Sequence, residues 1–119
     1  MEESDKRRIR QKESEISDYN SKISQCETAL TSIATAVSKI NGAIGSYDKL
    51  KKSANTNIQI NDKVFDLDRL DSIKEALDSA LDGLSSAKTK ISSQISSYNS
   101  SISSLRYQIN KIKREASDD

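Results

Sequence analysis

The chain has 119 residues, of which 34% are hydrophobic, 4% aromatic and 31% charged, and its 19 basic and 18 acidic residues leave a net charge of +1. This length allows one domain, and the charge balance argues against a disordered polyelectrolyte and against a dedicated nucleic-acid-binding domain. Pro is absent, and no apolar run is long enough to span a membrane. The acidic N-terminus lacks the apolar stretch of a signal peptide. We therefore expect a cytoplasmic protein, or one exported with a partner by a route that reads no cleavable signal.

The first periodic segment predicts a helix over residues 4–52. Apolar residues recur every seven positions at heptad position a. A second apolar series, at heptad position d, lies beside the first and is interrupted by Lys12. Such a pattern is typical of a long helix that buries one narrow stripe against another helix. The a ladder is Ile9, Ile16, Ile23, Leu30, Val37 and Ile44, and its d companions are Tyr19, Cys26, Ile33, Ile40 and Tyr47.

Residues 53–65 interrupt the heptads and are rich in Asn, Asp and β-branched residues. This composition predicts a loop with turns and short strands. Ser72 and Glu75 then have the spacing of a capping box, so we expect a frayed helix start between Asp66 and Ser72. The apolar loop residues are expected to form a small cap over the hairpin end, or alternatively a partner-contact patch; they are Ile58, Ile60, Val64 and Phe65.

The second periodic segment predicts a helix over residues 68–116. It is rich in serine between Ser85 and Ser104. Because serine is a mediocre helix former, this helix depends on packing more than on intrinsic propensity. Its d ladder is Leu70, Leu77, Leu84, Ile91, Tyr98, Leu105 and Ile112, and its a ladder contains Leu81, Ile95, Ile102 and Ile109.

The two predicted helices have matched lengths and a loop of about 13 residues between them, which favours an antiparallel fold-back. The predicted fold class is therefore all-α, a long antiparallel two-helix coiled-coil hairpin spanning residues 1–119 as a single domain. Positions whose numbers sum to about 120 should face each other. Examples are Ile44 with Leu77 and Ile9 with Ile112.

Small residues directly before the a positions widen the apolar stripe of each helix from two positions per heptad to three. A lone hairpin would leave this stripe partly exposed, so we expect a partner or a second copy to complete a four-helix assembly. Gly42, Gly45 and Gly83 allow close backbone approach or bending, or are simply tolerated. The residues predicted to contact the partner are Ala29, Ile33, Ala36, Ala43, Ala80, Leu84 and Ala87.

Residues that carry chemistry are scarce. There is no His and one Cys, so the chain lacks the ligands of a structural zinc site and the residue pair that Cys–His catalysis requires. The chain also lacks a glycine-rich phosphate loop, and its acids between Asp62 and Asp71 lack the spacing of a calcium loop. We predict no enzyme activity, no cofactor and no metal site. Cys26 is expected to be a small core residue, with a disulfide across a symmetric dimer as the alternative.

Basic residues gather near both chain ends, beginning with the run from Lys6 to Lys12. Acidic residues lie among them, and the spacing of Lys111 and Glu115 suits an ion pair on a helix face. We interpret this end as a solvated, self-neutralised surface. The alternative is a site for an anionic surface.

The chain resembles, over its whole length, the small all-helical proteins that accompany Leu-x-Gly toxins in type VII secretion loci of Gram-positive bacteria. The segments that carry the resemblance are Ile9–Ile16, Ile40–Tyr47 and the serine-rich repeats around Ile91–Ile95. The chain has no Trp and therefore no Trp-x-Gly turn, and none of its four tyrosines is followed by an acid four residues later. The resemblance implies that the protein binds the helical N-terminal domain of a toxin as a targeting chaperone, with any export signal on the partner or on a second small helical protein.

Three functional hypotheses follow. The first is a helical interaction protein that helps to present a type VII toxin. The second is a self-associating structural coiled coil that forms a homodimer. The third is a membrane or nucleic-acid adaptor that uses the basic end. The low basic excess argues against nucleic acid, and the lack of an apolar span argues against an integral membrane protein.

Overall fold

The computed structural model describes the backbone of residues 1–56, 59–60, 63–64 and 67–117, and the side chains of residues 1–53 and 69–117. Its elements are helix α1 (Glu3–Thr56), strand β1 (Gln59–Ile60), strand β2 (Lys63–Val64) and helix α2 (Leu67–Ser117). The strands pair antiparallel, with Gln59 opposite Val64 and Ile60 opposite Lys63. The predicted all-α hairpin is confirmed, and the short strands lie in the segment whose composition predicts them.

Both helices are slightly longer than the heptads predict. The acidic residues Glu3 and Asp5 lie in the first turn of α1, where they complement the positive end of the helix dipole. Helix α2 begins at Leu67, so Ser72 lies inside the helix and the predicted capping box at its start is wrong. The predicted apolar cap of the loop lies outside the described side chains.

Three threonine hydroxyls bond to the backbone of their own helix. The side chains of Thr28, Thr35 and Thr89 each donate a 3.1 Å hydrogen bond to the backbone carbonyl four residues earlier. These bonds satisfy the hydroxyls on the helix surface without breaking the helix.

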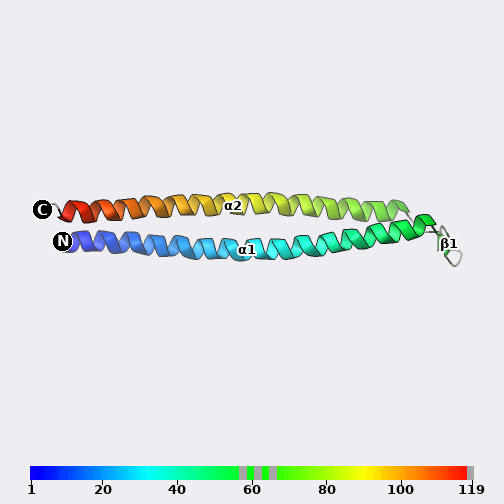
Figure 1. The fold of residues 1–119 in the computed structure, drawn as a ribbon, viewed down its shortest axis with the longest axis horizontal. Coiled ribbons are helices and arrows are strands. Elements are labelled where there is room, and N and C mark those ends of the chain that lie inside the picture. Colours follow the sequence, from blue (N-terminus) through cyan, green and yellow to red (C-terminus); the bar gives the residue numbers. More distant parts are fainter. Residues whose placement is uncertain (57–58, 61–62, 65–66, 118–119) are drawn as a thin grey trace. The chain divides into compact units, whose positions relative to one another are not determined.

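The chain divides into two units. Unit 1 comprises Met1–Leu30 and Lys90–Asp119, and unit 2 comprises Thr31–Thr89. Within each unit, a segment of α1 runs antiparallel to a segment of α2 (Figure 1). Unit 1 carries both chain ends, and unit 2 contains β1 and β2.

Unit 1 contains the main apolar core of the described residues. Ile9, Ile109 and Ile112 form a buried cluster, and Ile16 packs against it. The predicted proximity of Ile9 and Ile112 is therefore confirmed. Ile102, in the same unit, is also buried. This cluster joins the two chain ends.

A second group of contacts in unit 1 is aromatic. The rings of Tyr19 and Tyr98 lie 5.6 Å apart with an interplanar angle of 41°. The ammonium group of Lys22 lies 5.5 Å from the Tyr19 ring and 5.8 Å from the Tyr98 ring. Both rings are half-buried, and Cys26 is half-buried one heptad after Tyr19. The seam of unit 1 thus combines aliphatic and aromatic contacts.

Unit 2 buries far less. Of its described apolar side chains, Tyr47 is buried, whereas Val37, Ile44, Leu77 and Leu84 are half-buried. The ammonium group of Lys74 lies 5.7 Å from the centroid of the Tyr47 ring. This contact confirms the predicted antiparallel register, since 47 and 74 sum to about 120.

Candidate protein-interaction site

The heptad register defines the surfaces of unit 2. We label seam positions a and d, so that g is the residue before each a and e is the residue after each d. In α1, the a positions are Val37 and Ile44, and the d positions are Ile40 and Tyr47. In α2, the a position is Leu81, and the d positions are Leu77 and Leu84. Because the helices are antiparallel, g positions of the two helices lie on one side of the seam and e positions on the other.

One side of unit 2 is apolar at every g position. The register set by Tyr47 and Lys74 places Leu50 opposite Ile73, then Ala43 opposite Ala80, and Ala36 opposite Ala87. We call this surface the apolar flank; its members are Ala36, Ala43, Leu50, Ile73, Ala80 and Ala87.

The largest members of the apolar flank are exposed. Leu50 is 41% exposed and Ile73 is 48% exposed, and Ala43 and Ala80 are also exposed. Ala36 and Ala87 are half-buried. An exposed pair of large aliphatic side chains beside exposed alanines forms one continuous apolar strip, and contiguous strips of this kind mark interaction surfaces.

The structure places the seven predicted partner-contact residues in three settings. Ala36, Ala43, Ala80 and Ala87 belong to the apolar flank. Ile33 and Leu84 lie at d positions and are half-buried in the seam of unit 2, and Ala29 is half-buried in unit 1. The structure thus brings four of the seven together on one surface.

Sequence reasoning missed Leu50 and Ile73. Leu50 lies seven residues after Ala43, and Ile73 lies seven residues before Ala80. Extending each alanine series by one heptad would have found both residues. The search for small residues passed over them because they are large.

The other side of unit 2 is polar. Its e positions are Ala34, Asn41 and Asp48 in α1, and Asp71, Asp78 and Ser85 in α2. The remaining acids with described side chains in unit 2, Glu75 and Asp82, lie at b positions, next to this polar side. In contrast, the c positions beside the apolar flank carry Lys39 and Arg69. The described acids of unit 2 therefore lie on the side away from the apolar flank, while Lys39 and Arg69 lie at c positions on the side of the flank.

A polar cluster holds the register of unit 2. The Tyr47 hydroxyl donates a hydrogen bond to Oδ1 of Asp71, and Nζ of Lys51 donates to the same oxygen at 3.0 Å. These two hydrogen bonds, that of Tyr47 first, lower the pKa of the Asp71 carboxyl. The hydrogen bond to Asp71 raises the pKa of Tyr47 and that of Lys51. The cluster joins α1 to α2 by one carboxylate that two donors share.

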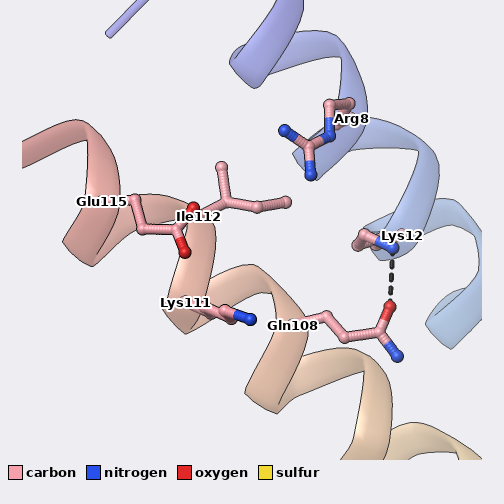
Figure 2. A pocket seen from close by; sticks show the side chains of 6 residues that line it. All are labelled: Arg8, Lys12, Gln108, Lys111, Ile112 and Glu115. Carbon is pink, nitrogen blue, oxygen red and sulfur yellow. Dashed lines mark hydrogen bonds between the residues drawn. The ribbon is translucent and has the colours of Figure 1, made fainter.

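A small pocket lies in unit 1. It has a volume of about 220 Å³ and combines three cationic groups with one carboxylate around the Ile112 side chain (Figure 2). Lys12, which interrupts the d ladder, donates a 2.7 Å hydrogen bond to Oε1 of Gln108 across the helix pair. This hydrogen bond gives the ammonium group of Lys12, which lies at a seam position, a polar partner on the opposite helix. The pocket is lined by Arg8, Lys12, Gln108, Lys111, Ile112 and Glu115.

The basic end near the N-terminus is partly neutralised along α1. Lys6 pairs with Glu3 at 3.9 Å, and Arg8 pairs with Asp5 at 3.4 Å. These pairs are exposed and span three residues of the same helix. They agree with the interpretation of a solvated, self-neutralised surface.

The glycines have no packing role inside the described structure. A Cβ atom at Gly42, Gly45 or Gly83 would meet no atom within 4 Å beyond the neighbouring backbone of its own helix. Close approach of the chain's own helices therefore does not explain them. Gly83 lies at a c position beside Ala80, on the edge of the apolar flank.

In the described residues, no helix is long and apolar enough to cross a membrane, and no group of three or more His, Cys, Asp or Glu side chains is placed to hold a metal ion. Compared with known proteins, the chain matches no family model, no curated protein and no solved structure.

Proposed function

We propose that the protein is a helical interaction protein that binds another helical protein along the apolar flank and the half-buried seam of unit 2. The observation that carries this proposal is the small size of the core. Among the side chains that the structure describes, the buried hydrophobic residues are Ile9, Tyr47, Ile102, Ile109 and Ile112. Most of the apolar ladder residues thus keep part of their surface in water.

Energetics point in the same direction for unit 2. Full burial of a Leu or Ile side chain contributes about 1.5–3 kcal/mol, and half-burial realises only part of it. Ordering each residue costs about 1–2 kcal/mol in backbone entropy. A partner that covers the half-buried seam would supply the missing burial.

We further propose that the partner is the helical N-terminal domain of a type VII toxin, which the protein helps to present for secretion from the cytoplasm. This step rests on the resemblance to the small helical partner proteins of Leu-x-Gly toxins. The hairpin fold and the apolar flank are compatible with that role. The proposal includes no catalytic activity and no cofactor.

Self-association is the second candidate function. In the apolar flank, Leu50 and Ile73 lie at one end and alanines make up the rest. Two copies packed side by side could therefore bring their apolar flanks into contact. Such a homodimer would form a four-helix bundle.

Light scattering combined with circular dichroism on the purified chain tests the proposal. A weakly helical or aggregating chain that becomes strongly helical in a stoichiometric complex with a toxin N-terminal domain would support it. A stable, strongly helical monomer that gains no mass with that domain would contradict it. A concentration-dependent helical dimer would favour the second candidate.

A further inference from the structure

The pocket of unit 1 carries charges that the proposed function does not use. Arg8 and Lys12 of α1 lie across from Lys111 and Glu115 of α2, around the Ile112 side chain (Figure 2). Three cationic groups and one carboxylate leave an excess of two positive charges in this small space. The net charge of the whole chain is +1. The pocket thus concentrates positive charge on a chain that is nearly neutral.

Helical spacing brings these groups to one side of the seam. Arg8 and Lys12 are four residues apart on α1, and the pocket residues of α2 follow one another at intervals of three and four, as from Gln108 to Lys111 to Glu115. Residues at such intervals are neighbours on a helix face. Arg8, Gln108 and Glu115 occupy g positions, which lie on the same side of an antiparallel pair. The sequence pattern therefore agrees with the convergence of side chains in the pocket.

Each cationic group keeps N–H donors that the chain itself does not use. The Arg8 guanidinium uses one nitrogen in an exposed 3.4 Å contact with Asp5, which leaves its other N–H groups free. The Lys12 ammonium donates a 2.7 Å hydrogen bond to Gln108 and retains further N–H groups. Among the side chains that the structure describes, Lys111 has neither a hydrogen-bond partner nor an ion-pair partner. Donors from both helices are therefore available to a bound anion.

The apolar wall of the pocket strengthens its attraction for anions. Ile112 is buried and belongs to the aliphatic cluster of unit 1. Such a wall keeps water away from one side, and an excess of one charge beside a low-dielectric wall focuses the electric field. The Glu115 carboxylate opposes the attraction. It limits the affinity without reversing the sign of the local charge.

We infer that the pocket of unit 1 binds a tetrahedral dianion of the phosphate class. Two negative charges balance the local excess of two positive charges. Oxygen acceptors that point in several directions suit donors from both helices, and arginine and lysine side chains are the usual donors to phosphate. The pocket volume of about 220 Å³ is several times the share of about 30 Å³ that one water molecule occupies in the liquid. A phosphate group therefore fits together with some of its hydration water.

A phosphate in this pocket connects the two helices near the chain ends. Arg8 and Lys12 contact it from α1, and Lys111 contacts it from α2. Because the anion binds the folded helix pair in preference to the unfolded chain, it stabilises unit 1 as its concentration rises. This ligand site is separate from the partner surface proposed for unit 2.

A phosphate titration of the full-length chain tests the inference. Two-dimensional NMR of the backbone amides follows the addition of inorganic phosphate at constant ionic strength, with chloride as the balancing anion. We expect saturable shifts concentrated at residues 8–12 and 108–115. Saturation should require millimolar phosphate, because exposed charge contacts are individually weak. Sulfate, which is also a tetrahedral dianion, should compete with phosphate.

A matched pair of lysine variants locates the site. Lys111 and Lys113 are exposed lysines of α2, but Lys113 lies at an e position on the other side of the seam. Lys111→Gln should weaken phosphate binding about two- to fivefold, the range expected for one exposed ion pair. Lys113→Gln removes the same charge from the chain and should have a clearly smaller effect.

The pocket carboxylate provides a test of opposite sign. Glu115→Gln removes the charge that opposes the anion and should tighten phosphate binding about two- to fivefold. Glu13→Gln changes the net charge equally and serves as the control, because Glu13 lies at an e position on the other side of the seam. A merely structural role of Glu115 does not predict tighter binding.

A second arm of the experiment separates two sources of the phosphate group, a free small molecule and a lipid headgroup. The chain is sedimented with phosphatidylcholine vesicles that contain or lack phosphatidic acid. Sedimentation that requires phosphatidic acid, and that Lys111→Gln weakens more than Lys113→Gln, supports the site with a lipid as its ligand. A chain that stays in the supernatant while free phosphate shifts the pocket residues supports the site with a small molecule as its ligand.

Three results would overturn the inference. They are shifts that chloride reproduces at equal ionic strength, equal effects of Lys111→Gln and Lys113→Gln, and an affinity that Glu115→Gln leaves unchanged. The first two would mean that phosphate only screens the charges of the chain. The third would mean that no bound anion lies beside Glu115.

Discussion

Unit 1 and unit 2 use the same heptad pattern but are held together differently. Unit 1 buries an aliphatic cluster of Ile9, Ile109 and Ile112, and it also buries Ile102. Unit 2 buries Tyr47 and links its helices through the carboxylate of Asp71. Equal sequence periodicity therefore does not mean equal burial. The unit with less burial is the one that carries the apolar flank.

This difference suggests a division of roles. The aliphatic cluster of unit 1 gains stability from the hydrophobic effect without help from another chain. Unit 2 depends on polar contacts that are half-exposed, and exposed ion pairs contribute little. We interpret unit 1 as the part that holds the chain ends together. Under the proposed function, a partner would cover the half-buried seam of unit 2.

The largest expected effect is the loss of a buried isoleucine in unit 1. Ile109→Ala should lower the free energy of unfolding by about 2–5 kcal/mol, because it removes buried methyl groups and leaves a cavity. The matched change Ile44→Ala, at a half-buried position of unit 2, should cost clearly less. Urea denaturation followed by circular dichroism measures both. Equal losses would contradict the difference between the two units.

The next effect concerns pH and the Asp71 cluster. Because the pKa of Asp71 is lowered in the fold, its stabilising contribution is present above the ordinary carboxyl pKa and is lost as the pH falls through the folded-state pKa. The raised pKa values of Tyr47 and Lys51 have the opposite sign, so their contribution is lost as the pH rises through those values. Unit 2 should therefore loosen at both acidic and strongly alkaline pH.

Amide hydrogen exchange resolves this pH effect by unit. Protection in unit 2 should fall at acidic pH before protection in unit 1 does. Asp71→Asn should lower protection in unit 2 at neutral pH and flatten its acid dependence. Asp78→Asn, on the same side of α2, serves as the control and should keep the acid dependence. Uniform loss of protection along the chain would argue against a special role of this cluster.

A smaller, stabilising effect is expected at Gly83. Gly83→Ala should raise the free energy of unfolding by about 1 kcal/mol, because alanine is the better helix former and its Cβ meets no other atom within 4 Å. Gly42→Ala should have a similar effect on stability. A thermal melt of both variants checks this expectation, and a loss of stability with either alanine would contradict it.

The smallest effect is expected at the exposed ion pairs of unit 1. Arg8→Ala removes the 3.4 Å contact with Asp5 and should change the free energy of unfolding by less than about 1 kcal/mol. The change should shrink further in high salt. Denaturation at low and high ionic strength checks this. A loss as large as that of Ile109→Ala would contradict the small contribution expected of this ion pair.

Much of the fold could be predicted from local pattern. The seven-residue spacing from Ile9 to Ile44 indicates one long helix, and the spacing from Leu70 to Ile112 indicates the second. The start of α2 was predicted to within one residue, since residue 68 was expected and the helix begins at Leu67. The capping box of Ser72 and Glu75, however, does not mark that start. Capping groups compete with continued helix, and a short motif does not reveal which one wins.

The candidate site was predicted in part. Four alanines of the apolar flank were found because they repeat with the heptad. Leu50 and Ile73 were missed, because only small residues were considered. The contact of Asp71 with Tyr47 and Lys51 was not predicted either. Such contacts join residues that are far apart in the chain, and no local pattern shows them.

The sequence by itself determined the two helices and their antiparallel register, because heptad spacing and loop length are properties of consecutive residues. The tertiary structure alone decided how burial is shared between the two units. It placed Ile9, Ile109 and Ile112 in one buried cluster and left Leu50 and Ile73 exposed on one side of unit 2. The physical reason is that burial depends on which side chains the opposite helix supplies at each level, and a single helix does not carry that information.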